Sequence, residues 1–292
     1  MNPAIKSAKK QINMKTDIRN LYYRAAHRLG LRKDHFPQII ALDVIPSRIC
    51  RFEVTNRYEA GRVKPANIEK EFLTQLLAEL NSADVFFDIG AGIGLFSIYA
   101  ATIAHCQVVS FEPDPEIRSR FLHNLTLNNL SAFELRAGNR QPVNKSKPHS
   151  SQIPSLQIVP WGVSNMQSQA TLFSDGIRGN SPSLSQVHDL QHSITIELKS
   201  LDHAVATAEI PIPSLVKIDV EGAEVLALQG MANLLSSEKA PRLIFIELHP
   251  QFLPSFTTST QEFYEFMASH HYQETLCTQR GAESHHIFQR IQ

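Results

Sequence analysis

VFFDIGAGIG, residues 85–94, is the stretch that decides the fold of this 292-residue chain. Its apolar first half predicts a buried strand, and the helical pattern LFSIYAATIA (95–104) follows the glycines at once. A strand that turns into a helix through glycines brings bare backbone close to a ligand, because glycine has no Cβ. The same turn points the unpaired N–H groups of the helix start at that ligand. The stretch therefore predicts an α/β domain with a ligand site at the end of its first core strand.

The spacing of the three glycines indicates the class of ligand. A dinucleotide site has the pattern G-x-G-x-x-G, but here Gly94 comes one residue early and Leu95 stands where the third glycine would be. What remains is D-x-G-x-G-x-G, which begins at Asp88. A carboxylate at that position suits a cofactor with a cationic amino acid end better than one with a pyrophosphate. The spacing favours S-adenosylmethionine, and a nicotinamide cofactor stays as the alternative.

The second core strand predicted from the sequence ends in an acidic residue. QVVSFEP (107–113) is apolar up to Glu112, which comes 24 residues after Asp88. In α/β nucleoside sites, an acid at the end of the second strand accepts hydrogen bonds from the ribose hydroxyls. We therefore predict this role for Glu112, with a solvated acid at a strand end as the alternative.

The stretch IVPWGVSN (158–165) predicts a third strand that ends at Trp161 and Gly162. Its tryptophan, which is the only one in the chain, is a candidate for contact with adenine. A position in the hydrophobic core is the alternative. Beyond it, ATLFSDG (170–176) and SITIELKSL (193–201) predict two added strands, which together would form an extra β-hairpin.

Strands alternate with helices across the middle of the chain. IEKEFLTQLLAELN (68–81) has the pattern of an amphipathic helix, SLVKIDVEGAEVLALQGM (214–231) reads as a strand and a helix, and LIFIELHP (243–250) reads as another strand. The polar stretch 138–157 lacks periodicity and predicts a surface loop. This alternation predicts a mainly parallel sheet with helices on both faces. Functional groups then gather at the carboxyl ends of the strands, where Asp88, Glu112, Trp161, Asp219, Glu247 and His249 all stand.

The composition narrows the class of protein. The chain has 28 basic and 28 acidic side chains, so no overall charge steers it to nucleic acid. Its three cysteines are far apart, which argues against a disulfide scaffold or a zinc site and for a reducing compartment. No signal peptide pattern follows the early lysines, and the sequence predicts a soluble, cytoplasmic protein.

The amino-terminal segment differs from the rest in charge. Residues 1–36 carry nine Lys and Arg side chains against two Asp, and DIRNLYYRAAHRLGL (17–31) has helical spacing. We expect a helix packed on the domain; a helix at a membrane surface or on a partner is the alternative. Residues 37–63 give short β-like runs. We predict an amino-terminal extension at 1–65 and one domain at 66–292.

Several segments together resemble one known family. They are the glycine loop, FEPDPEIRSRFLHNLTLNNL (111–130), SLDHAV (200–205), KIDVEGAEVLALQGM (217–231) and RLIFIELHP (242–250). In this order they resemble the FkbM-type family of S-adenosylmethionine-dependent methyltransferases over roughly residues 70–275, and the KIDVEGAE segment is the most specific of them. The family usually has asparagine in a G-A-N-x-G loop, whereas this chain has Gly92.

The resemblance implies a Rossmann-like class I methyltransferase fold with a mainly parallel seven-stranded sheet. It also implies O-methylation of a hydroxyl on a sugar, a lipid-linked glycan or another small molecule, with S-adenosyl-L-homocysteine as the second product. The predicted cofactor-binding residues are Asp88, Gly90, Ala91, Gly92, Gly94, Glu112, Pro113, Trp161 and Gly162.

Methyl transfer to a hydroxyl also requires that its proton be removed. Asp219, Glu221 and His249 are the predicted catalytic residues, with Asp219 or His249 as the base. One alternative is a structural network of Asp219, Glu221 and Lys217 that closes the strand-to-helix turn. Another is a divalent cation on Asp219, Glu247 and His249, although the spacing does not demand one and we predict no metal. Glu224 is expected to cap or solvate its helix.

Two other functions stay open at this point. One is a nicotinamide-dependent oxidoreductase on a similar sheet. The other is a non-catalytic scaffold that binds partners through the basic amino-terminal segment. Nucleic-acid methylation is disfavoured, because no D/N-P-P-Y/F tetrapeptide follows the strand that ends at Asp219. The sequence indicates neither the methyl acceptor nor the oligomeric state.

Overall fold

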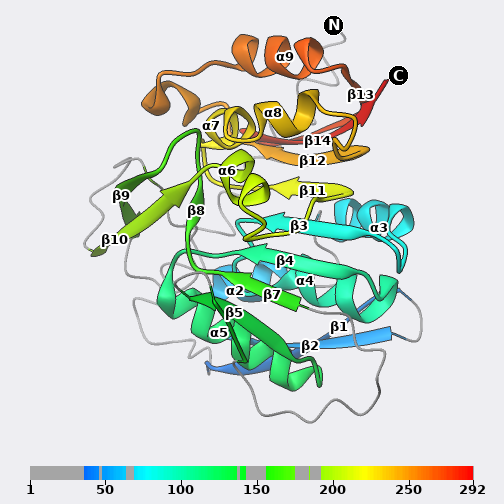
Figure 1. The fold of residues 1–292 in the computed structure, drawn as a ribbon. Coiled ribbons are helices and arrows are strands. Elements are labelled where there is room, and N and C mark those ends of the chain that lie inside the picture. Colours follow the sequence, from blue (N-terminus) through cyan, green and yellow to red (C-terminus); the bar gives the residue numbers. More distant parts are fainter. Residues whose placement is uncertain are drawn as a thin grey trace, which may run out of the picture. The chain divides into compact units, whose positions relative to one another are not determined.

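The computed structural model describes residues 36–45, 48–63, 69–136, 139–142, 156–174, 184 and 192–291 (Figure 1). The chain divides into two compact units, residues 1–38 and 39–292, and nearly all of the described residues belong to the second. The helix predicted at residues 17–31 lies outside the described residues. Among those described, no helix is both long enough and apolar enough to cross a membrane.

The main sheet has nine strands within the described residues, in the order β13-β14-β12-β11-β3-β4-β7-β5-β6. The six consecutive strands from β12 to β5 pair in parallel, and the strands at both edges pair antiparallel (Figure 1). Their bounds are β3 (Val85–Ile89), β4 (Gln107–Phe111), β5 (Ala132–Arg136), β6 (Asn139–Pro142), β7 (Leu156–Val159), β11 (Leu215–Ile218), β12 (Leu243–Leu248), β13 (Tyr272–Arg280) and β14 (Glu283–Arg290). This arrangement confirms the predicted fold class.

The number of strands differs from the predicted seven because of β5 and β6. These two strands form a hairpin at one edge of the sheet, where β5 also pairs with β7. Neither has a clear apolar alternation: Phe133 in β5 is 41% exposed, and β6 reads Asn-Arg-Gln-Pro. The prediction of a loop over 138–157 is therefore wrong at Asn139–Pro142 and also at 156–157, because β7 begins at Leu156. Residues 138 and 143–155 lie outside the described part. Pairing with a neighbour, rather than the local pattern, makes these residues strands.

Helices cover both faces of the sheet, as predicted. On one face α3 (Glu69–Glu79), α4 (Leu95–Tyr99) with its π-helical continuation η1 (Ala100–Ala104), and α5 (Pro115–Leu127) pack on the strands. Phe72 of α3 there contacts Phe245 of β12 and Phe96 of α4. The opposite face carries α6 (Leu201–Ala206), α7 (Glu224–Gln229), α8 (Ala232–Ser236) and α9 (Thr260–Ser269), which share one hydrophobic core with the strands. A short 3-10 helix, η2 (Leu253–Phe256), follows β12.

A second, three-stranded sheet consists of β8 (Gly162–Val163), β10 (His192–Lys199) and β9 (Ser168–Ser174), in that order. The antiparallel pair β9–β10 is the predicted added hairpin. The single strand predicted at 158–165 is divided in two, because β7 ends at Val159 and the chain then enters the second sheet at Gly162. This sheet lies beside the carboxyl ends of the central strands (Figure 1).

The β-like runs before residue 63 are strands that pack against the domain. β1 (Gln38–Ile45) and β2 (Arg48–Val54) form a two-stranded sheet, followed by α2 (Arg57–Arg62). The side chain of Asn124 in α5 accepts a hydrogen bond from the backbone N–H of Glu53 at 2.8 Å. Asn56 caps α2 by accepting from the N–H of Glu59. These contacts hold α2 beside the sheet, while the division at residue 65 stays a prediction.

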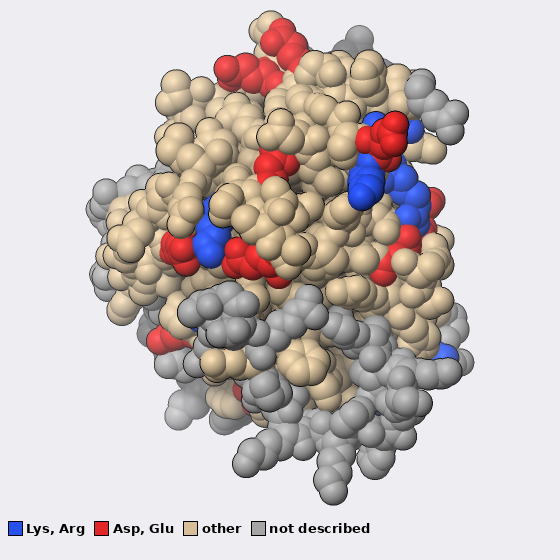
Figure 2. All heavy atoms as spheres, viewed as in Figure 1, with Lys and Arg blue, Asp and Glu red and all other residues tan. Residues whose placement is uncertain are grey.

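Charge on the surface is mixed rather than segregated. Figure 2 shows Lys and Arg side chains lying next to Asp and Glu side chains in small groups on the face it displays. One such group joins Lys199 to Glu197 and Glu209, at 3.6 and 3.3 Å. Of these side chains only that of Glu197 is exposed, at 50%, so its pair with Lys199 is the one that water and salt screen most.

Candidate functional site

The glycine loop needs glycine for two reasons, its positive φ angles and the close packing of its neighbours. Gly90, Gly92 and Gly94 all have positive φ, at 78°, 56° and 90°. A Cβ on Gly90 would lie 1.9 Å from the carbonyl oxygen of Asp219, and one on Gly94 would lie 2.1 Å from the ring of Phe121. A Cβ on Gly92 would meet nothing within 4 Å. Two glycines are therefore required by their neighbours, and Gly92 presents bare backbone to open space.

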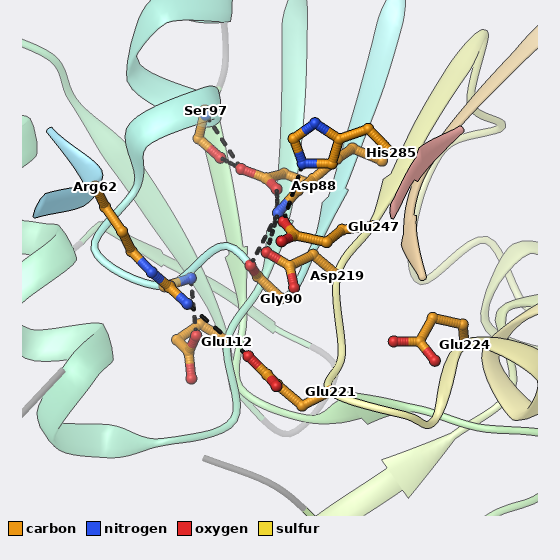
Figure 3. Close-up of polar contacts among 12 residues, drawn as sticks. Arg62, Asp88, Gly90, Ser97, Glu112, Asp219, Glu221, Glu224, Glu247 and His285 are labelled. Carbon is orange, nitrogen blue, oxygen red and sulfur yellow. Dashed lines mark hydrogen bonds and ion pairs between the residues drawn. The ribbon is translucent and has the colours of Figure 1, made fainter. Parts of the chain in front are cut away.

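The carboxylate of Glu112 lies across this loop at the end of β4. Its Oε2 accepts a hydrogen bond from the N–H of Gly92 at 2.9 Å, and its Oε1 accepts from the N–H of Asp114 at 3.0 Å (Figure 3). Burial raises the pKa of Glu112 to about 8, and the two backbone N–H groups oppose that rise only in part. Glu112 does not turn away to solvent, since it is only 6% exposed.

A pocket opens at the carboxyl ends of β3, β4 and β11. It holds about 920 Å³ of space, including its mouth to solvent. Backbone and acidic groups line one part, and apolar side chains from the second sheet line another. The lining includes Glu59, Arg62, Gly90, Gly92, Ile93, Glu112, Pro113, Ile117, Gly162, Val163, Leu172, Ile196, Leu198, Asp219 and Glu221. Of the predicted cofactor-binding residues, Gly90, Gly92, Glu112, Pro113 and Gly162 thus meet at one cavity.

Asp88 lies beneath the loop and does not line the pocket. Its side chain is fully buried. Its Oδ2 accepts hydrogen bonds from the N–H and the Oγ of Ser97 at 3.1 and 2.6 Å, and its Oδ1 is 3.5 Å from Nζ of Lys217 (Figure 3). Sequence reasoning placed this carboxylate against the cationic end of a ligand. The structure instead places it where it fixes the first turn of α4.

Lys217 is the centre of a buried polar network under the loop. Its Nζ donates to the carbonyl oxygen of Gly90 at 3.3 Å and to Oδ2 of Asp219 at 3.2 Å, and it lies 4.8 Å from the ring centre of Phe96. Burial by itself would lower the pKa of Lys217, but the carboxylates of Asp219 and Asp88 outweigh it and raise that pKa. The predicted network of Asp219, Glu221 and Lys217 is thus formed in part, since Glu221 has other partners.

His249 is buried between two glutamates at the end of β12. Its Nδ1 lies 2.7 Å from Oε1 of Glu224, and its Nε2 lies 3.5 Å from Oε2 of Glu221. Burial alone would lower the pKa of His249, but the hydrogen bond to Glu224 and the charge of Glu221 raise it to about 10. An imidazole that is already protonated at neutral pH does not accept a proton, so His249 does not fit the predicted role of base.

Asp219 lines the pocket but is also a weak base. Burial would raise the pKa of its carboxyl, yet the charges of Lys217, His249 and Arg62 hold that pKa well below its usual range. A carboxylate that binds protons so weakly stays ionised and acts through its negative charge. The sequence offered Asp219 and His249 as alternative bases; in the structure each is paired with a group that opposes that role.

The sequence analysis missed two residues of this region, Arg62 and Glu69. Arg62 lies at the end of α2, lines the pocket, and places Nη2 3.9 Å from Oε1 of Glu221 (Figure 3). Burial raises the pKa of Glu69 to about 7, with Arg62 opposing the rise. Glu224, which was expected to cap or solvate its helix, is fully buried and accepts from the N–H of Gly222 at 2.9 Å just before α7, which fits the capping alternative. Arg62 and Glu69 precede the glycine loop in regions without a motif, so only the fold brings them here.

Trp161 belongs to the core rather than to the pocket. It is 2% exposed, and its ring packs edge-on against Phe111 with 5.1 Å between ring centres. The neighbouring Gly162 and Val163 reach the cavity instead. Of the two positions that the sequence left open for this tryptophan, the structure places it in the core. Ala91 is 7% exposed and does not line the pocket; its N–H donates to the carbonyl oxygen of Phe111 at 3.0 Å.

Residues 88–274 match the family described as the methyltransferase FkbM domain, which is well over half of the chain. The chain belongs to the FkbM methyltransferase family. The resemblance predicted from the sequence is thus confirmed. In this family member the backbone of Gly92 is left-handed with open space beside it. Asparagine also tolerates that conformation, so glycine and the asparagine expected from the resemblance are both compatible with the shape of the loop.

Two curated relatives are methyltransferases by name. The chain is 28% identical over 200 residues to the hexuronic acid methyltransferase AglP of Haloferax volcanii, which covers 68% of this chain and 70% of that protein. It is 23% identical over 197 residues to methyltransferase 1 of Beauveria bassiana, which covers 62% of this chain and 75% of that protein.

Solved structures of methyltransferases also resemble the chain. The methyltransferase FkbM from Methylobacillus flagellatus has a TM-score of 0.44 and 16% identity over 72% of this chain. The chain spans 44% of the length of that protein. TrmK of M. capricolum, solved in complex with S-adenosyl-homocysteine, has a TM-score of 0.41 and 12% identity, covering 75% of this chain and 67% of that one.

Proposed function

We propose that this FkbM family member transfers the methyl group of S-adenosylmethionine to a hydroxyl oxygen of a sugar or glycan. In this reaction the bond from sulfur to the methyl carbon breaks and a bond from oxygen to that carbon forms. S-adenosyl-L-homocysteine is the second product, and the hydroxyl gives up a proton. One observation carries the proposal: bare backbone at Gly92 and the buried carboxylate of Glu112 border the same open pocket at the ends of β3 and β4.

The lining of the pocket fits each part of this cofactor. Glu112 would accept hydrogen bonds from the ribose hydroxyls, since carboxylates are strong acceptors for such groups. The apolar side chains of Leu172, Ile196 and Leu198 would bury a flat base such as adenine. The negative charge of Asp219 would lie on the side of the positive sulfonium. Each of these residues lines the pocket in the structure.

The residues of this chain contribute position and charge to the transfer. The cofactor supplies an activated methyl group when it is bound. Lys217 holds Asp219 in its ionised form under the loop, and His249 with Glu224 orients Glu221. Asp219 and Glu221 are the carboxylates that would hold an acceptor hydroxyl and orient it for in-line attack. Holding the two reactants at near-attack distance supplies much of the rate in such a displacement.

A relative named for hexuronic acid supports an acidic sugar as the acceptor. Such an acceptor presents a carboxylate together with neighbouring hydroxyls. Arg62 lines the pocket, and 40% of its side chain is exposed. Its guanidinium would meet the acceptor carboxylate, because arginine binds carboxylates with paired hydrogen bonds.

A membrane contact through residues 1–36 and a cytoplasmic location stay proposals from the sequence.

Calorimetry and a transfer assay test the function. We expect S-adenosyl-homocysteine to bind the full chain, and Glu112→Ala to weaken that binding by about 1.5–3 kcal/mol. Glu116→Ala, at an exposed position of the neighbouring helix α5, is the matched control and should bind as the wild type does. Labelled methyl groups should pass to a hexuronic acid acceptor. A wild-type chain that binds neither S-adenosylmethionine nor its product would overturn the proposal.

Ligand affinity should depend on pH through Glu112. Since the pKa of this carboxyl is about 8, it is largely protonated near neutral pH and becomes a charged acceptor as the pH rises. Methylthioadenosine has the same ribose but no titrating amino acid part, so it isolates the effect. Its affinity should increase on the order of ten-fold between about pH 6.5 and about pH 9. In Glu112→Gln the affinity should not change with pH; an equal pH dependence in that variant would assign the effect to another group.

A further inference from the structure

Three side chains from two strand-to-helix connections converge beside the pocket. They are Asp219 after β11, Glu221 in the turn before α7 and His249 after β12. One carboxylate oxygen from each acid and one ring nitrogen of the histidine all lie within 4.8 Å of one another. Two carboxylate oxygens and one imidazole nitrogen are a donor set that Mn²⁺ accepts well, and that Mg²⁺ accepts with water in its remaining positions.

The histidine is oriented in the manner of a metal ligand. Nδ1 of His249 is 2.7 Å from Oε1 of Glu224, so Nε2 is the nitrogen on the side of Glu221, 3.5 Å from its Oε2. Histidines that bind metals almost always donate their other ring N–H to a carboxylate or a carbonyl, which fixes the ring and its tautomer. Here Glu224 is the carboxylate that accepts from the other ring nitrogen, and both His249 and Glu224 are buried.

One carboxylate oxygen of Glu224 contacts His249 and the N–H of Gly222, and the other has a different surrounding. Its side chain is fully buried, and among the described residues its Oε2 has no hydrogen-bond partner. Figure 3 shows the Glu224 carboxylate pointing from α7 toward the side where Asp219 and Glu221 lie. A buried carboxylate oxygen without a partner is costly in an apolar surrounding. The cation would bind Nε2, on the far side of the imidazole from Glu224, so it would act on this carboxylate through the ring of His249.

Two neighbouring cations also contact the acids of this group. Lys217 takes Oδ2 of Asp219, and Arg62 lies beside Oε1 of Glu221, so the Oε2 of Glu221 faces His249 instead. A second group, Glu247, His249 and Glu283, shares the same histidine, but Glu247 already pairs with Arg280 at 2.6 Å and His285 at 3.4 Å. The group of Glu274, Cys277 and His286 lies at the edge of the sheet with two of its members exposed.

We propose that Asp219, Glu221 and His249 bind a divalent cation of the Mn²⁺ and Mg²⁺ class, and that Glu224 positions His249 for it. The cation takes the place of the proton on Nε2. Because Asp219 and Glu221 line the pocket, the open coordination positions face the methyl acceptor. An acceptor that offers two adjacent oxygens, such as a sugar carboxylate beside a hydroxyl, would bind there; this part rests on the proposed function. Metal coordination lowers the pKa of a bound hydroxyl, which then loses its proton to solvent water.

Titration of the chelator-treated full chain with Mn²⁺, followed by electron paramagnetic resonance, tests the site directly. We expect one Mn²⁺ per chain in the wild type. Asp219→Asn and His249→Ala should remove it, and Glu224→Gln should weaken it by about 10–100-fold, as loss of an orienting partner does. Glu283→Gln and Glu274→Gln are matched controls in the two other groups and should bind Mn²⁺ as the wild type does.

Calorimetry with S-adenosyl-homocysteine on the same samples separates the two proposals. If the wild type binds the nucleoside but no Mn²⁺, the metal site is wrong and the proposed function stands. If the wild type binds Mn²⁺ but not the nucleoside, the proposed metal site stands and the proposed function is wrong. Retention of Mn²⁺ by folded Asp219→Asn, together with its loss from Glu283→Gln, would assign the ion to the other group and overturn the proposal. The wild-type titration decides the matter even where a variant does not fold.

Discussion

Gly90→Ala should destabilise the protein by at least ~3 kcal/mol or prevent it from folding. The added Cβ would lie 1.9 Å from the carbonyl oxygen of Asp219 and 3.0 Å from its carbonyl carbon. Both are backbone atoms of the neighbouring turn, so neither can rotate away. The φ of 78° at Gly90 adds strain for any residue with a Cβ. Urea denaturation, followed by circular dichroism, measures the loss, and expression without soluble protein would be its extreme form.

Two other glycines are controls for this prediction. Gly281, in the turn between β13 and β14, has a similar φ of 72°, and a Cβ added there would meet nothing within 4 Å. Gly281→Ala therefore reports the backbone strain alone, about 1 kcal/mol. Gly92→Ala should lower the free energy of unfolding by a similar amount, and its larger effect should be on ligand binding. If Gly90→Ala loses no more stability than Gly281→Ala, the loop does not pack on Asp219 as described.

Lys217→Met should lower the free energy of unfolding by about 3–5 kcal/mol near neutral pH. Lys217 is 3% exposed and lies 3.5 Å from Asp88 and 3.2 Å from Asp219. Its removal leaves two carboxylates without their shared cation in a region that water reaches poorly. An uncompensated buried charge costs more than the pair itself contributes. Chemical denaturation of wild type and variant at several pH values measures the difference.

The pH dependence identifies the cause of that loss. In the wild type the pKa of Asp219 is lowered, so its contribution to stability is present above the unfolded pKa near 4 and is lost as the pH falls through the folded pKa. In the variant the carboxylate of Asp219 has lost its cation and takes up a proton more readily. As the pH falls, the cost of burying an unpaired charge is therefore reduced in the variant. The gap between the two proteins should therefore shrink as the pH falls toward about 4.5. Asp88→Asn in the Lys217→Met background should restore part of the stability. A gap that is constant with pH would point to lost packing instead.

The glycine loop, the acid after it and the parallel sheet were predictable because their causes are local. The strand from Val85, the turn and the helix from Leu95 follow from neighbouring residues, and Glu112 stands where a strand pattern ends. The added hairpin at β9 and β10 also has its own pattern of alternation. The edge strand β6 has no such pattern and becomes a strand only by pairing with β5, so it was missed.

The chain alone determined the alternation of core strands and helices, the glycine loop and its membership of a methyltransferase family, because periodicity, turn chemistry and motif spacing depend on neighbouring residues. Tertiary structure decided the state of the charges. Asp88 lies under the loop, His249 lies between Glu224 and Glu221, and Arg62 reaches Glu221 from an earlier helix. Burial and the distance to an opposite charge set these properties, and both depend on which distant segments the sheet brings together.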